Sequence, residues 1–167
     1  HDYILIEKGK YIEETFHTDK TLTLSADSSN GAVSINANAL FKGNVRIDSC
    51  GFTEESSILS LHGKSSLLQH CWFNKCRTAL STSGHGNISV NNSTFSLCGE
   101  AIKSDANTRL TLSNSIIDKC TNTFSTQFFT NLNISHTDIW PKDYTKELNS
   151  KLIYNFNPML ANADTGN

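Results

Sequence analysis

The chain is 167 residues long, carries a formal net charge of −2 at pH 7 and has a hydrophobic content of 37%. This length fits one domain, and the apolar content is low for a compact globule but ordinary for a solenoid with a wide polar surface. The balanced charge, the few arginines (Arg46, Arg77 and Arg109) and the lack of a long apolar run argue against a nucleic-acid partner and against membrane insertion by this segment.

Residues 1–44 are predicted to form the first, less regular coils of the fold. Residues 2–13 combine a strand-like apolar pattern with a glycine turn, and Leu22 and Leu24 flank a polar residue as in a strand. Residues 27–31 consist of Asp, Ser, Asn and Gly, which indicates a turn. Val33 and Ile35 then indicate a short strand.

Residues 45–140 carry a motif that returns every 21 or 22 residues. Apolar and polar residues alternate within each repeat, which predicts strands rather than helices. A constant step of this size means that each repeat is one unit stacked on the next. Three sets of apolar positions keep the step: Phe52, Phe73, Phe95, Ile117 and Ile139; Ile47, Leu68, Val90, Leu112 and Ile134; and Leu59, Leu80, Ile102 and Phe124.

A coil of about 22 residues has room for three short strands and three turns, which is the cross-section of a right-handed parallel β-helix. The sequence therefore predicts an all-β solenoid in which neighbouring coils lie about 4.8 Å apart and like residues stack on like. Cys76, Cys98 and Cys120 share one phase, so we expect them to be small buried residues with free thiols.

A polar ladder accompanies the apolar ones. Asn92 and Asn114 stand where a strand pair ends, and His70 and His136 occupy the same phase one coil before and one coil after them. Stacked amides at a turn can satisfy backbone groups from coil to coil. We therefore interpret these four positions, histidines included, as turn residues.

The period breaks after Trp140 and Pro141, and residues 141–167 are predicted to form a C-terminal arm. Residues 142–153 have a spacing that suits one short helix or an irregular arm, and Trp140 and Phe156 are interpreted as lids over the last coil. We treat the whole chain as one domain and expect it to be a segment of a larger protein. Open coil ends would also allow end-to-end self-association.

The ladders, together with the string at residues 92–102 (NSTFSLCGEAI), resemble the parallel β-helix repeats of the pectate-lyase-like superfamily. The opening at residues 2–13 is similar to the first coil of such proteins. Residues 157–167 resemble the segment that follows the last coil in many secreted bacterial members. The resemblance covers nearly the whole chain and implies the fold, whereas this scaffold hosts lyases, hydrolases, epimerases, tailspikes, adhesins and intracellular binding modules alike.

Catalysis by a member of that superfamily requires carboxylates and a basic residue that successive coils bring together. The best mixed cluster in this sequence is Glu100, Asp118 and Lys119, but no phase holds two stacked carboxylates. We interpret the three as a scattered, solvated surface and keep them as the catalytic candidates. Cys71 and Cys76 beside His70 lack the further ligands of a zinc site, so neither a metal nor a cofactor is expected.

Trp72 precedes the inward Phe73, so alternation turns its side chain outward, in one row with Thr94 and Ile116. An exposed aromatic on a flat sheet suits stacking on a sugar ring or docking of a protein partner. Trp72, Thr94 and Ile116 are therefore the predicted ligand-binding residues. The alternative is that the C-terminal arm or a neighbouring segment covers this row.

Three functions remain open at this stage. The leading hypothesis is a non-catalytic segment of a secreted or cell-surface protein, a stalk or adhesin that binds glycan or protein on one face. The first alternative is a fragment of a carbohydrate-active enzyme of the polysaccharide lyase or hydrolase type. The second is an intracellular, cytoplasmic scaffold for protein interactions, which free thiols would suit.

Overall fold

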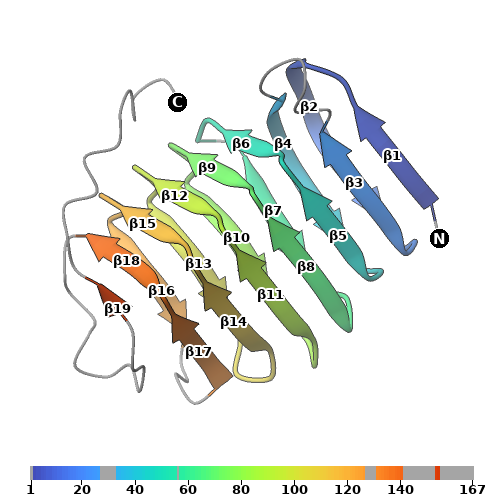
Figure 1. Ribbon diagram of the computed structural model, residues 1–167. Coiled ribbons are helices and arrows are strands. Elements are labelled where there is room, and N and C mark those ends of the chain that lie inside the picture. Colours follow the sequence, from blue (N-terminus) through green and yellow to red (C-terminus); the bar gives the residue numbers. More distant parts are fainter. Residues whose placement is uncertain (1, 27–32, 56, 127–130, 141–152, 155–167) are drawn as a thin grey trace.

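The computed structural model describes residues 2–26, 33–55, 57–126, 131–140 and 153–154. These residues form a parallel β-solenoid in which every strand pair is parallel and each coil stacks on the one before it (Figure 1). The predicted turn at residues 27–31, Phe156 and most of the C-terminal arm lie outside the described residues. The all-β solenoid with coils of about 22 residues is confirmed.

One sheet holds the first strand of each coil and has seven members. In their spatial order they are β1 (Asp2–Ile6), β3 (Leu22–Ala26), β5 (Val45–Asp48), β8 (Ser65–Gln69), β11 (Asn87–Asn91), β14 (Arg109–Ser113) and β17 (Leu132–Ser135).

The other sheet bends around a corner and so provides the two remaining walls of the solenoid. The two walls meet at the long strand β4 (Val33–Phe41), which pairs with a short strand at one end and with a longer strand at the other. The short strands are β6 (Gly51–Thr53), β9 (Trp72–Asn74), β12 (Thr94–Ser96), β15 (Ile116–Asp118), β18 (Thr137–Trp140) and β19 (Ile153–Tyr154). The longer strands are β7 (Ile58–Leu61), β10 (Thr78–Thr82), β13 (Glu100–Ser104) and β16 (Asn122–Thr126).

The first coils depart from the predicted short strand at Val33 and Ile35. β2 (Gly9–Thr18) spans ten residues and pairs with β4 along most of its length, across a register shift between Ile12 and Thr15. The strands β2 and β4 therefore each run through two walls of the solenoid, which a period of 22 residues does not reveal. At the other end, β19 lies within the predicted C-terminal arm of residues 141–167 and pairs in parallel with β18.

The core is built from the predicted ladders. Phe52, Phe73 and Phe95 are buried, with ring centroids 5.3 Å and 4.6 Å apart and interplanar angles of 12° and 4°. Ile117 and Ile139 continue this row. All five cysteines are buried and free, which confirms the prediction for the Cys76 ladder.

From the coil of β5 onward, residues with positive φ mark two corners, the first in five of the described coils and the second in four. The first corner holds the predicted turn ladder, and backbone N–H groups there donate across coils, as from Asn92 to the Ser113 carbonyl (3.1 Å) and from His70 to the Asn91 carbonyl (3.2 Å). Non-glycine residues rarely adopt this backbone, which Asn and His tolerate best. The interpretation as turn residues is confirmed. The first corner holds Ser49, His70, Asn92, Asn114 and His136, and the second holds Glu54, Lys75, Leu97 and Lys119.

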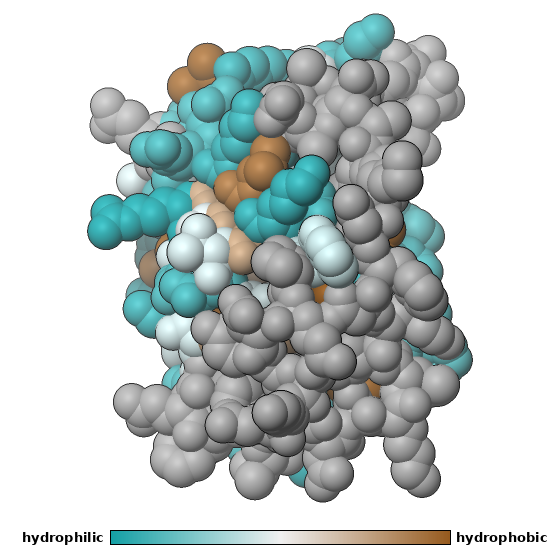
Figure 2. All heavy atoms as spheres, turned by 90° about the vertical axis from the view of Figure 1, so that its left-hand side faces the viewer, coloured by the Kyte–Doolittle hydropathy of each residue, from teal (hydrophilic) through white to brown (hydrophobic). Residues whose placement is uncertain are grey.

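The two ends of the solenoid differ in the polarity of their described surface. Viewed from the end at which β17 and β18 lie, the described atoms are mostly hydrophilic, with small apolar patches between them (Figure 2). At the opposite end, the edge strands β1 and β2 leave large apolar side chains exposed, with Ile12 67% and Tyr3 63% accessible. No described helix has the length and apolar character that crossing a membrane requires.

Candidate functional site

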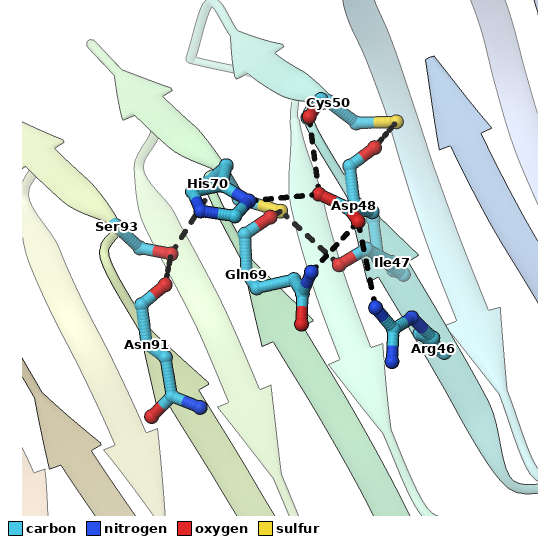
Figure 3. A network of polar contacts seen from close by, with 10 residues as sticks. Arg46, Ile47, Asp48, Cys50, Gln69, His70, Asn91 and Ser93 are labelled. Carbon is cyan, nitrogen blue, oxygen red and sulfur yellow. Dashed lines mark hydrogen bonds and ion pairs between the residues drawn. The ribbon is translucent and has the colours of Figure 1, made fainter.

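A cluster of polar side chains surrounds Asp48 at the first corner of two neighbouring coils (Figure 3). Asp48 ends β5 and is in register with Gln69, the last residue of β8. Gln69 donates from Nε2 to Asp48 Oδ2 (2.7 Å), and Ser49 Oγ donates to Asp48 Oδ1 (3.0 Å). His70 Nδ1 lies 3.0 Å from Oδ1, and a guanidinium nitrogen of Arg46 lies 3.6 Å from Oδ2. One carboxylate thus positions four surrounding side chains.

These contacts keep Asp48 ionised. Its partial burial raises the pKa, but hydrogen bonds from His70, Ser49 and Gln69 outweigh burial, and the pKa of Asp48 lies below its usual value. Because the ionised carboxylate can only accept, His70 donates from Nδ1 and its Nε2 is the ring atom turned away from Asp48. The His70 side chain is 55% exposed.

The Asp48→Asn variant tests this network through its pH dependence. We expect the substitution to cost about 1–3 kcal/mol of unfolding free energy at pH 5, because it removes a charged acceptor of several hydrogen bonds. A group whose folded pKa is depressed stabilises the fold above its unfolded pKa of about 3.9 and loses that contribution as pH falls through the folded pKa. The difference from wild type should therefore shrink between pH 5 and pH 2. Urea titrations across this range measure it, and a difference independent of pH would contradict the assignment.

Trp72 lies beside this cluster and covers a glycine of the preceding coil. Gly51 and Trp72 are in register, and a Cβ built on Gly51 would fall 2.0 Å from Trp72 Cε2 and 2.3 Å from Nε1. The indole therefore occupies the space that a side chain at position 51 would fill, and Gly51 itself is buried beneath it. One side of the ring rests on the sheet, and the residue remains partly exposed.

The predicted row on the short strands is present in the structure. Trp72 is in register with Thr94, and Thr94 with Ile116, and all three are partly exposed. Because the indole lies over Gly51, its platform extends toward β6, away from Thr94. The row continues at Asp138 of β18.

The aromatic platform and the polar cluster share one corner of the fold. Trp72 follows His70 by two residues and Gly51 follows Asp48 by three, so both features sit on the same two coils. We call Arg46, Asp48, Gln69, His70 and Trp72 the Asp48 corner. Sequence reasoning found only Trp72 here and took His70 as a turn residue alone. The missed signal was the one-coil separation that brings Asp48 next to both Gln69 and His70.

Asp118 is not on a solvated surface, contrary to our interpretation of the sequence. Its side chain is 1% exposed, and neither carboxylate oxygen has a hydrogen-bond partner among the described residues. Burial raises the pKa of Asp118, and Lys119, whose Nζ is 3.8 Å from Oδ2, opposes that shift. Asn74 and Ser96, in register with Asp118 on the preceding coils, are buried as well.

Glu100 belongs to a different wall. It begins β13 and accepts a hydrogen bond from Thr78 Oγ1 (2.9 Å) of the preceding coil. Within the described part of the chain, no hydrogen bond or ion pair joins Glu100 to Asp118 or Lys119. A search of the same residues for three or more His, Cys, Asp or Glu side chains positioned to hold a metal ion finds none.

Comparison with known proteins identifies one family. The family model of rhamnogalacturonase A/epimerase, pectate lyase-like, matches residues 11–125, about two thirds of the chain. No curated protein and no solved structure matches the chain. The matched region contains most of the β2–β4 pair, the Asp48 corner and the stacked phenylalanines. The chain therefore belongs to the rhamnogalacturonase A/epimerase, pectate lyase-like family.

Proposed function

We propose that this chain is a non-catalytic, polysaccharide-binding β-helix segment whose ligand binds at the Asp48 corner. The observation that carries the proposal is the Trp72 indole, which rests on Gly51 beside a cluster of fixed polar side chains. The family's name refers to enzymes that act on a pectic polysaccharide, which supports a glycan as the ligand class.

Each part of the corner suits one feature of a sugar. The apolar face of a pyranose ring can stack on an indole that is held flat by the backbone beneath it. Sugar hydroxyls both donate and accept, and Gln69, His70 and Asp48 together offer both kinds of group. Because these side chains already hold one another, binding would order few of them, and less conformational entropy would be lost.

The same geometry speaks against catalysis at this corner. Glycoside hydrolysis uses two carboxyl groups about 5–10 Å apart, one with a raised pKa that acts as the acid. Asp48 has a lowered pKa instead. Asp118, whose pKa is raised, is the observation that favours the second candidate, a carbohydrate-active enzyme, but its carboxylate is fully buried.

The proposal also bears on cellular location and on partners. Glycan binding suits a secreted or cell-surface protein. Thr94 and Ile116 would extend the ligand contacts beyond Trp72. The five free thiols are the feature that favours the alternative, a cytoplasmic scaffold that binds protein. The exposed apolar side chains of β1 and β2 would support end-to-end self-association.

A glycan array that includes pectic oligosaccharides tests the proposal, with the wild type beside Trp72→Ala and Gly51→Val. We expect wild-type binding that both variants lose, the first because the ring is absent and the second because a side chain at position 51 displaces it. Loss of a stacked aromatic should weaken binding about tenfold or more. Tyr11→Ala removes another exposed aromatic, one that is in register with Ile35 and lies outside the Asp48 corner, and it should bind as wild type does.

The same samples are tested for polysaccharide cleavage. The Asp118→Asn variant is added to this assay. Cleavage that Trp72→Ala retains and Asp118→Asn loses would contradict the proposal and show that the chain is a carbohydrate-active enzyme. Silence of the wild type in both assays would contradict glycan binding and favour a stalk or protein scaffold.

A further inference from the structure

The second corner of the solenoid contains a stack of three thiols. Cys76, Cys98 and Cys120 occupy the same position in three successive coils, and they are 1%, 1% and 8% exposed. Backbone hydrogen bonds tie these positions together, from Gly99 N to the Cys76 carbonyl (2.9 Å) and from Thr121 N to the Cys98 carbonyl (2.9 Å). The side chains therefore leave the backbone in parallel, one coil apart. We call these three residues the thiol ladder.

This spacing suits a bridging metal better than a disulfide. Parallel side chains on neighbouring strands have Cβ atoms about 4.8 Å apart, beyond the range of about 3.5–4.5 Å that a disulfide needs. Two metal–thiolate bonds of about 2.3 Å in a straight line span about 4.6 Å, which matches the coil spacing. Three sulfurs in a row cannot converge on one tetrahedral ion, so the fit is to a cation that accepts two collinear ligands.

Each thiol of the ladder donates to a backbone carbonyl: Cys76 to that of Phe52 (3.3 Å), Cys98 to that of Ser96 (3.3 Å) and Cys120 to that of Asp118 (3.7 Å). Cys76 also lines an open surface depression, which offers a route from solvent. Its charged lining residues are Glu54, Glu55, Lys75 and Arg77.

We propose that the thiol ladder binds one soft monovalent d10 cation, Cu⁺ or Ag⁺, in linear coordination between Cys98 and one of its two neighbours. Thiolate sulfur is the ligand that such soft ions prefer. Two S–H groups each release a proton to solvent, two metal–sulfur bonds form, and no electron is transferred. Cys98 belongs to both possible pairs, so it is the residue that binding requires.

The probe for the test is Ag⁺, which does not change its oxidation state, added to the reduced protein in chloride-free buffer. The parent carries Cys50→Ser and Cys71→Ser, which removes the other stacked cysteine pair. Serine should be tolerated there, because Ser93 and Ser115 hold the equivalent position and donate to the carbonyl two residues before them (2.9 Å and 2.8 Å). Native mass spectrometry gives the stoichiometry, and calorimetry in two buffers gives the affinity and the protons released.

We expect one Ag⁺ per chain and about two protons released on binding. Adding Cys98→Ala should weaken binding by more than the 10- to 100-fold that the loss of an outer-shell partner costs. Cys76→Ala and Cys120→Ala each leave one pair and should bind close to the parent value. If Cys98→Ala does not fold, the combined Cys76→Ala and Cys120→Ala variant, which also leaves no pair, should show the same loss. A parent that binds no Ag⁺, or a variant without a pair that binds as tightly as the parent, would overturn the proposal.

Discussion

Replacing Phe73 by alanine is expected to lower the unfolding free energy by about 3–5 kcal/mol, the range for deleting a large buried aromatic. Phe73 is the middle ring of three, and its loss removes contacts with Phe52 (5.3 Å) and Phe95 (4.6 Å) at once. In a solenoid each coil is stabilised mainly by its neighbours, so a break in the middle of the stack weakens both halves. Urea unfolding followed by circular dichroism measures the loss.

Phe16→Ala provides the comparison for this prediction. Phe16 lies in β2 at the end of the solenoid, is 39% exposed and contacts one ring, that of Phe41, at 5.5 Å. Its removal should cost clearly less than the removal of Phe73. Equal losses for the two variants would mean that the phenylalanine stack does not hold the coils together.

The second large effect is expected for Gly63→Ala. A Cβ at position 63 would fall 2.2 Å from the carbonyl oxygen of Gly43 in the preceding coil, and that atom belongs to the backbone and cannot rotate away. Relieving the clash requires two coils to separate locally, so we expect a loss of about 3 kcal/mol, at the upper end of the cost of overpacking. The midpoint of thermal unfolding should fall with it.

Gly9→Ala is the matched control, because a Cβ there would make ordinary contacts of 3.5–3.7 Å with the Tyr11 ring. It should leave stability nearly unchanged. If Gly63→Ala were equally harmless, the close approach of the coils at this turn would be wrong.

The regular coils could be predicted from the sequence because a stacked position meets only its own counterparts above and below. This forces Phe73 to resemble Phe52 and Phe95, and it makes the period visible without any knowledge of the turns. The first coils could not be predicted in this way, because β2 and β4 run through a corner where the later coils have a turn.

The candidate site was harder to predict than the fold, because function depends on side chains that need not repeat. The position equivalent to Asp48 in a later coil is Ser113, a serine and not an acid. No repeated row of acidic residues therefore marks Asp48 in the sequence. Asp118 was interpreted as solvated, yet the structure buries it in one row with Asn74 and Ser96. The burial of this polar row could not be read from the spacing of the residues.

The central claim, that a glycan binds on the Trp72 indole, is tested most directly by the fluorescence of that residue. The chain has two tryptophans, so Trp140→Phe leaves Trp72 as the only indole. This protein is titrated with the glycan that gives the strongest array signal, and calorimetry measures the affinity in parallel. We predict a shift of Trp72 emission to shorter wavelength that saturates with the calorimetric affinity. Binding seen by calorimetry with no change in Trp72 emission would contradict the account.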